Sequence, residues 1–190
     1  ALVGSGASKA ATAASAVAES AAYEPPPPQL SPLEGASDYA GSWQYKWGDS
    51  PRDENGAFVW LRSVGPSSPP SDADFTALPK NAAPLPPNRN GNRFLWMRTV
   101  LDGPEVRDAT LYLEIVDQLF EAYLDGQRIH VFGDLDGTRR FLGYPVHFVP
   151  IGDDYRGRTL TLRIYSEHIN IGLNGRQRIG SKARLITETL

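Results

Sequence analysis

The sequence predicts an all-β domain, a two-sheet jelly-roll β-sandwich, and three observations support this prediction. Residues 110–132 contain two runs in which apolar and polar side chains alternate, the pattern of strands with one buried face. Asp125-Gly126 then separates two apolar runs, and this dipeptide favours a type I′ hairpin turn, which needs φ > 0 at both central residues. About eight short strand-like segments with long loops between them favour a sandwich over a helical fold.

Within residues 110–132 we expect a β-meander. Phe120, Ala122 and Leu124 occupy one face of its second strand, and the polar Glu121 alternates with them. The alternation indicates one buried and one solvent-facing side. We place this meander at the centre of the sandwich.

An alanine-, serine- and proline-rich stretch, residues 1–37, is predicted to be a disordered tail and linker. Residues 1–22 offer few large apolar side chains to a core, and Pro25–Pro28 form a polyproline spacer. Small residues also crowd the cleavage sites of signal peptides. A segment that follows such a site and a plain flexible tail therefore both stay open.

Aromatic residues dominate the first predicted strand, residues 42–47, where Trp43, Tyr45 and Trp47 share one face. A further short strand, with another tryptophan, is expected over residues 57–62. Buried aromatic rings commonly dominate protein cores. We therefore favour core packing of these rings over a platform for a sugar ring.

The second half of the chain supplies the other predicted strands. Residues 93–101 are apolar on both faces, which is typical of a central strand, and residues 144–150 and 158–166 also have strand character. Residues 64–92 and 133–143 are predicted to be long loops, because proline, glycine and charged residues dominate them.

A short helix is predicted at the C-terminal end. Residues 171–180 look irregular, and Ser181 is a suitable N-cap for a helix over residues 181–190. We therefore expect a binding domain over residues 38–178. Residues 179–190 are expected to start a helix that leads to a membrane or to a further domain.

Composition excludes several functions. The net charge of −3 and the pI near 5.6 argue against nucleic-acid binding, since Arg139-Arg140 is the only adjacent basic pair. The lack of cysteine excludes a disulfide framework and a thiolate metal site. No run of about 18 apolar residues is present, so this stretch of chain is not expected to cross a membrane.

Recognisable catalytic motifs are missing. No nucleophile elbow, phosphate-binding loop or dinucleotide fingerprint occurs. His130, His147 and His168 lack metal-ligand spacing and are expected at strand or loop surfaces. Asp134 and Asp136 match the front of a calcium loop but lack its closing acidic ligand, so a solvated turn is favoured over structural calcium. We expect neither catalysis nor a cofactor.

Four segments in order, WMRTVL, TLYLEIVDQLFEAYLDGQRI, YPVHFVPI and RTLTLRIYS, resemble the galactose-binding-domain-like jelly roll. The sugar-binding domain of family 2 glycoside hydrolases is similar over roughly residues 93–166. The residues that stand at matching places are Trp96, Arg98, Asp125, Gly126 and Arg163. This resemblance implies an accessory, non-catalytic carbohydrate-binding domain.

Residues 41–51, GSWQYKWGDSP, and residues 171–186, IGLNGRQRIGSKARLI, resemble extracytoplasmic sensor domains of bacterial membrane signalling proteins. These include seven-transmembrane receptors with diverse intracellular signalling modules. The resemblance implies a non-catalytic periplasmic sensor at the outer face of the inner membrane, in a parent with a GGDEF cyclase, histidine kinase or phosphatase output. The C-terminal helix would then continue into a membrane span.

These patterns leave three functions open. The first is a sensory module that recognises a small polar ligand or a partner protein, and the second is an accessory carbohydrate-binding domain. The third is a domain that only forms a homodimer. A run of about 20 apolar residues beyond Leu190 would favour the sensor. Ligand residues are expected in loops, and the candidates are Trp47, Asp49, Asp134, Asp136, Arg139, Arg140, His168, Asn170 and Asn174.

Overall fold

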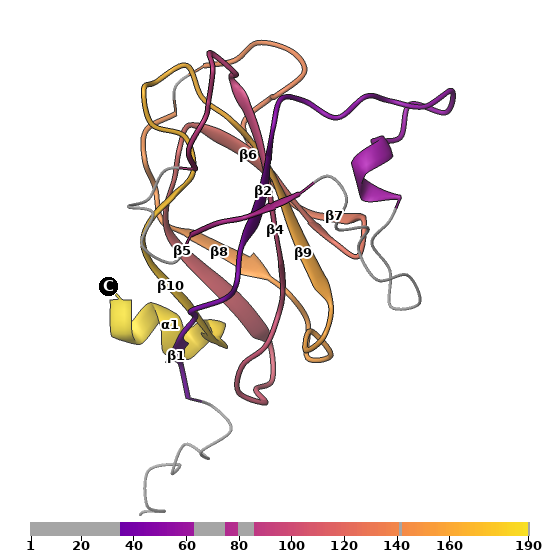
Figure 1. The fold of residues 1–190 in the computed structure, drawn as a ribbon. Coiled ribbons are helices and arrows are strands. Elements are labelled where there is room, and N and C mark those ends of the chain that lie inside the picture. The colour runs from indigo at the N-terminus through magenta and orange to yellow at the C-terminus, as the bar shows by residue number, and fades with distance from the viewer. Residues whose placement is uncertain (1–34, 63–74, 80–85, 141, 190) are drawn as a thin grey trace, which may run out of the picture.

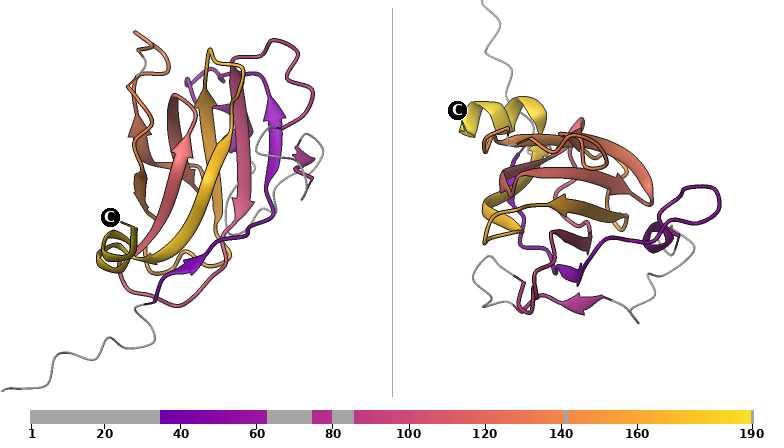
Figure 2. Two further views of the ribbon diagram at one scale, coloured as in Figure 1. Left: turned by 90° about the vertical axis from the view of Figure 1, so that its left-hand side faces the viewer. Right: turned by 90° about the horizontal axis from the view of Figure 1, so that it is seen from above.

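Two antiparallel β-sheets pack face to face in the computed structural model, which describes residues 35–62, 75–79, 86–140 and 142–189. The two layers stand side by side in Figure 2, and one short α-helix lies at the C-terminal end. The all-β sandwich predicted from the sequence is confirmed. The tail predicted over residues 1–37 lies outside the described residues up to residue 34, and the chain enters the sandwich at Ser37.

The larger sheet has six strands (Figure 1). In spatial order they are β3 (Thr76–Ala77), β2 (Gln44–Trp47), β4 (Phe94–Val100), β9 (Thr159–Tyr165), β6 (Leu119–Leu124) and β7 (Gln127–Phe132). β4 and β9 pair over their whole lengths in the middle of this sheet. The central position predicted for residues 93–101 is confirmed.

The smaller sheet has four strands. In spatial order they are β1 (Ser37–Asp38), β10 (Leu173–Ser181), β5 (Ala109–Val116) and β8 (His147–Pro150). The main apolar core lies between the two sheets and includes Trp43 and Tyr45, with Trp47 packed against it. These rings contribute to the core, as the sequence pattern favoured.

The expected meander over residues 110–132 is only half correct. The hairpin between β6 and β7 forms at Asp125-Gly126, whose φ angles are 48° and 82°. However, β5 belongs to the smaller sheet, so the chain changes sheet between β5 and β6. Gln118 makes this crossing with φ of 56°, a left-handed conformation that the alternation of side chains does not reveal.

The strand expected over residues 57–62 is absent, and a 3₁₀ helix, Val59–Leu61, replaces it. Asp53 closes a turn ahead of this helix, because its Oδ1 atom accepts the backbone N–H groups of Asn55 and Ala57. Tertiary packing therefore overrides the β propensity of this apolar run.

Residues 171–180 were expected to be irregular but mostly form β10. The strand pairs with β5 on both sides of a register shift between Asn174 and Gln177. Gly175 lies in this bulge with φ of 75°. The bulge explains why no clean alternation marks the strand in the sequence.

The predicted C-terminal helix is present as α1 (Lys182–Thr189). Ser181 caps it, because its Oγ atom accepts the N–H of Arg184 at 3.4 Å. Leu185 is buried, and Arg178 of β10 is ion-paired with Glu188 at 2.5 Å. The helix is thus docked on the smaller sheet through one apolar and one ionic contact.

His147 is buried between the two sheets, at the side of the sandwich where the edge strands β7 and β8 approach each other. The surface position expected for this histidine was therefore wrong. Its ring lies 4.7 Å from the rings of both Phe120 and Phe132, and 5.8 Å from that of His130. Neither histidine Nε2 atom has a hydrogen-bond partner among the described residues. Burial lowers the pKa of His147 to about 4, with a smaller contribution from His130.

Acidification should therefore destabilise the fold through His147. An unfolded-state pKa near 6.5 and a folded-state pKa near 4 mean that the unfolded chain binds the extra proton first. Stability is complete above pH 6.5 and falls as the pH is lowered from 6.5 to 4, by about 3 kcal/mol for this group. Urea unfolding at several pH values should show a flatter pH dependence in His147→Phe; the same slope in both proteins would contradict this assignment.

Candidate functional site

Five of the nine residues proposed from the sequence lie in two places on the sandwich. Asp49 and Asp136 join an ionic cluster around the buried Arg163 side chain, on the outer face of the larger sheet. Arg139, Arg140 and His168 line a small cavity between the loops at one end.

The Arg163 cluster consists of Arg163, Asp49, Glu121 and Asp136. Arg163 projects outward from β9, and its side chain is only 1% exposed. Its Nε and Nη2 atoms donate to the two carboxylate oxygens of Asp49 at 2.9 and 2.6 Å. Nη1 donates to Glu121 at 3.1 Å, and Nη2 also donates to Asp136 at 2.8 Å. One guanidinium therefore joins β6, β9 and two loops.

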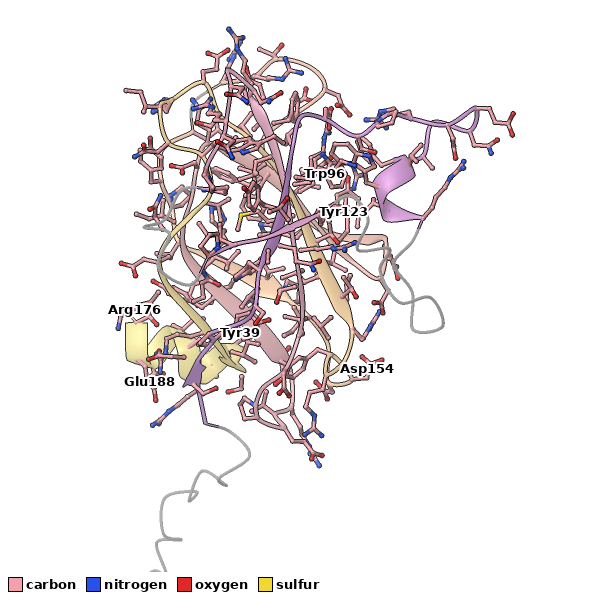
Figure 3. The ribbon with its side chains drawn as sticks, viewed as in Figure 1. Tyr39, Trp96, Tyr123, Asp154, Arg176 and Glu188 are labelled. Atoms are coloured by element: carbon pink, nitrogen blue, oxygen red, sulfur yellow. The ribbon has the colours of Figure 1, made fainter. Side chains whose placement is uncertain are left out.

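Aromatic rings surround this guanidinium. The rings of Phe58 and Phe94 lie 4.6 and 4.8 Å from its central carbon, within cation–π range. Beside it, Trp96 stacks on Tyr123 at 6.1 Å, and both lie between the larger sheet and the 3₁₀ helix in Figure 3. Trp96 Nε1 donates to Asp49 at 3.1 Å. The outer face of the larger sheet thus has an apolar and ionic layer of its own.

Charge compensation is nearly complete in the Arg163 cluster. Arg52 pairs with Asp136 at 2.6 Å and Arg128 pairs with Glu121 at 3.2 Å. Burial opposes the charge of Arg163, but its hydrogen bonds to Asp49 and Asp136 outweigh burial and raise its pKa. The pKa of Asp136 is lowered, because its bonds to Arg163 and Arg52 likewise outweigh burial. These carboxylates are committed to holding the fold.

No pattern in the sequence marked Glu121 as a partner in an ion pair. Its alternation with Phe120 and Ala122 predicted a solvent-facing side chain, but it is buried on the outer face. Glu121 in β6 and Arg163 in β9 face each other in register, and this pairing is visible only in the structure.

Asp134 closes a turn. Its Oδ1 atom accepts the N–H groups of Asp136 and Gly137 at 3.2 and 2.8 Å. With Asp136 bound to arginines, this arrangement favours the turn over the calcium loop. No group of three acidic or histidine side chains among the described residues could hold a metal ion.

Three further candidates hold loops and strands in place. Trp47 donates from Nε1 to the carbonyl of Pro87 at 2.6 Å. The amide of Asn174 donates to Asp117 at 3.3 Å, and burial raises the pKa of that carboxyl. The carbonyl of Asn170 accepts the hydroxyl of a neighbouring serine at 3.1 Å.

The loop-end pocket is a cavity of about 230 Å³ between the loops after β5, β7 and β9. Its lining residues are Gln118, Leu119, Arg139, Arg140, Tyr165, Glu167 and His168. The sequence pointed to three of them, and the other four come from strand ends and the sheet crossing. Only the fold brings these four to the same place.

The two arginines of the loop-end pocket are held differently. Arg139 donates from Nε to the carbonyl of Leu135 at 2.7 Å, and its guanidinium lies 4.6 Å from the ring of Tyr165. Arg140 is exposed and has no polar partner among residues 35–62, 75–79, 86–139 and 142–189. The guanidinium of Arg139 is therefore oriented by its neighbours, whereas the guanidinium of Arg140 can bind a ligand.

Gln118 and Glu167 also line the loop-end pocket. The backbone N–H of Glu167 donates to Gln118 Oε1 at 2.6 Å. The Glu167 carboxylate accepts the hydroxyl of Tyr165 at 2.6 Å and an N–H of Arg93 at 3.2 Å. This carboxylate is already engaged within the protein.

Arg89 stabilises the loop that carries His168. Its guanidinium donates to the carbonyl oxygens of Ser166, His168 and Ile169. The hydroxyl of Tyr144 lies 3.0 Å from His168 Nδ1, and Tyr144 is 45% exposed. An exposed aromatic ring therefore lies beside the hydrogen-bonding groups of the pocket.

A larger groove of about 1220 Å³ runs along β4 and the segment before β2. Its polar groups bond with one another: Arg98 Nε donates to Gln44 at 2.7 Å, and Trp43 Nε1 donates to Gln177 at 3.0 Å. The groove adjoins Pro79, the last described residue before residues 80–85, which the structure does not describe. We therefore take the loop-end pocket as the candidate site.

Comparison with known proteins shows the fold. No family model and no curated protein sequence matches the chain. The β-glucuronidase from Ruminococcus gnavus, in complex with an N1-substituted uronic isofagomine, matches with a TM-score of 0.53 at 11% identity, over 80% of this chain and 30% of that one.

Two other solved structures match more weakly. A β-glucuronidase from an uncultured Clostridium sp. has a TM-score of 0.48 at 14% identity, over 84% of this chain and 31% of that one. A family 2 glycosyl hydrolase from Bacteroides cellulosilyticus has 0.46 at 12% identity, over 76% and 20%. The chain thus spans less than a third of these enzymes. No described helix is long and apolar enough to span a bilayer.

Removing the central cation should destabilise the fold strongly. Arg163→Met leaves the carboxylates of Asp49 and Glu121 without their shared partner, which typically costs about 3–5 kcal/mol. Arg156→Met is the matched control, because its pair with Glu105 is exposed and is expected to contribute about 1 kcal/mol or less. Equal losses in denaturant unfolding would show that the cluster does not carry this role.

Proposed function

We propose that the chain is a non-catalytic carbohydrate-binding module of a larger protein, which takes its ligand at the loop-end pocket. The observation that supports this proposal is the convergence of Arg139, Arg140, His168 and Gln118 on one small cavity. The sandwich fold shared with a β-glucuronidase agrees with it. The resemblance to the sugar-binding domain of family 2 glycoside hydrolases points the same way.

The chemistry of the pocket suits a sugar. Sugar hydroxyls need several directed donors and acceptors, while the ring faces need an apolar surface. Gln118 and His168 supply hydrogen-bonding groups, and the exposed ring of Tyr144 supplies an aromatic surface next to them. Loops braced on a packed sandwich provide the preorganisation that binding requires.

The absence of catalysis is part of the proposal. Glycoside hydrolysis uses two carboxyl groups, one of them free to protonate the leaving group. In the loop-end pocket the only carboxylate is Glu167, and it is held by Tyr165 and Arg93. The carboxylates of the Arg163 cluster are paired with arginines. No aryl glycoside should therefore be turned over by the purified chain.

Sugar binding at this pocket is tested by two arginine variants. Arg140→Gln should weaken glycan binding about tenfold or more, because it removes an exposed charged donor from the pocket. Arg156→Gln makes the same change near Asp154, at the far end of the sandwich in Figure 3, and should leave binding unchanged. Calorimetric titration after a glycan-array screen measures both; equal effects of the two variants would place the ligand elsewhere.

A sensory role in the periplasm is the second candidate, and one structural link favours it. Asn174 in β10 bonds to Asp117 beside the loop-end pocket, and the same strand runs directly into α1. Ligand-induced change at the pocket therefore has a continuous path to the C-terminal helix. In this role the parent protein carries a cyclase, kinase or phosphatase output across the inner membrane.

Hydrogen exchange distinguishes the sensor from a simple accessory module. In the sensor, ligand should change amide exchange across residues 182–189 as well as around Gln118 and His168. A protection change confined to the pocket loops would support the accessory module alone. A full-length sequence with about 20 apolar residues after residue 190 would add support for the sensor.

A further inference from the structure

The loop-end pocket carries an excess of positive charge that the described parts of the chain do not neutralise. Its only carboxylate, on Glu167, pairs with Arg93 outside the lining. Arg140 has no carboxylate partner in the described parts of the chain, and Arg139 has only its backbone and aromatic contacts there. This excess stands in a chain whose net charge is −3.

Most other arginines of the described chain are ion-paired. Carboxylate partners lie within salt-bridge distance of Arg52, Arg62, Arg128, Arg156, Arg158, Arg163, Arg176, Arg178 and Arg184. Two adjacent arginines without such partners, both lining one cavity, are therefore unusual in this protein. Like charges in one small cavity repel each other unless an anion compensates them.

Arg139 is oriented for an oxyanion. Its Nε atom donates to the carbonyl of Leu135 at 2.7 Å, and its guanidinium carbon lies over the ring of Tyr165 at 4.6 Å. The two terminal amino groups have no polar partner in the described chain. A guanidinium fixed in this way can bind a carboxylate or sulfate through two parallel hydrogen bonds.

From these observations we infer that the loop-end pocket selects acidic glycans, sugars that carry a carboxylate or sulfate group, over neutral ones. This inference rests on the proposed carbohydrate-binding function and names the ligand class. Arg139 and Arg140 bind the oxyanion. Gln118 donates from its amide nitrogen to a ring hydroxyl, because its oxygen is already engaged by the backbone of Glu167.

The test is a calorimetric titration of the full 190-residue chain with three oligosaccharides of matched length. They are a uronate oligosaccharide, its carboxyl-reduced neutral counterpart, and a sulfated oligosaccharide. At least one acidic ligand should bind ten times or more tighter than the neutral one, and its affinity should fall as sodium chloride rises. Whichever acidic ligand binds more tightly identifies carboxylate or sulfate as the recognised group.

Two variants localise the selectivity. Arg140→Gln should reduce the affinity for the acidic ligand at least tenfold and should reduce the affinity for the neutral ligand by a clearly smaller factor. Arg156→Gln, which removes the same charge from the far end of the sandwich, should change neither. Unchanged thermal unfolding of both variants would show that the fold is intact, as expected for exposed side chains.

The results of the titrations distinguish a failure of the selectivity for acidic glycans from a failure of carbohydrate binding itself. Equal affinities for the acidic and neutral oligosaccharides, which Arg140→Gln reduces by the same factor, overturn the selectivity for anions and leave carbohydrate binding at the loop-end pocket in place. Binding of none of the three ligands overturns both. Acidic selectivity that is equally reduced by Arg156→Gln would show a general effect of net charge and would also overturn the inference.

Discussion

The burial of one positive charge is the constraint on which much of this structure depends. Arg163 lies on a central strand of the larger sheet with almost no solvent contact, so its charge must be compensated inside the protein. Asp49, Glu121 and Asp136 provide that compensation from three different segments. The loop after β2 and the loop after β7 are therefore both held on the outer face of the sheet.

The candidate site depends on the same constraint. Asp136 is bound to Arg163, and Leu135 immediately before it is buried and accepts the Nε hydrogen bond of Arg139. The segment that carries Arg139 and Arg140 is thus positioned by the ionic cluster only a few residues away. Arg89 fixes the facing loop by bonding its carbonyl oxygens. Charged groups in the fold hold the loops, and loops held in this way can present a preorganised pocket.

Sequence patterns located some elements better than others for physical reasons. The Asp125-Gly126 hairpin was predictable because a left-handed turn restricts residue choice locally. The helix after Ser181 was predictable because a capping hydroxyl is also a local signal. The assignment of β5 and β6 to different sheets was not, since alternation shows which side is buried but not which partner covers it. The apolar run before Arg62 does not form a strand, because Phe58 and Trp60 pack against the ring of Trp96.

The sequence by itself determined the hairpin and the capped C-terminal helix, because each depends on contacts between near neighbours in the chain. It also indicated the all-β class and the central strand β4, because side-chain alternation and a run that is apolar on both faces show which sides of a strand are buried. It also pointed to Arg139, Arg140 and His168, since charged loop residues are visible in any sequence. Only the tertiary structure decided that Asp49 and Asp136 bind Arg163, while the two arginines face a cavity with Gln118 and Glu167. The reason is that the balance of charges in a site depends on which distant side chains meet, and sheet pairing sets those meetings.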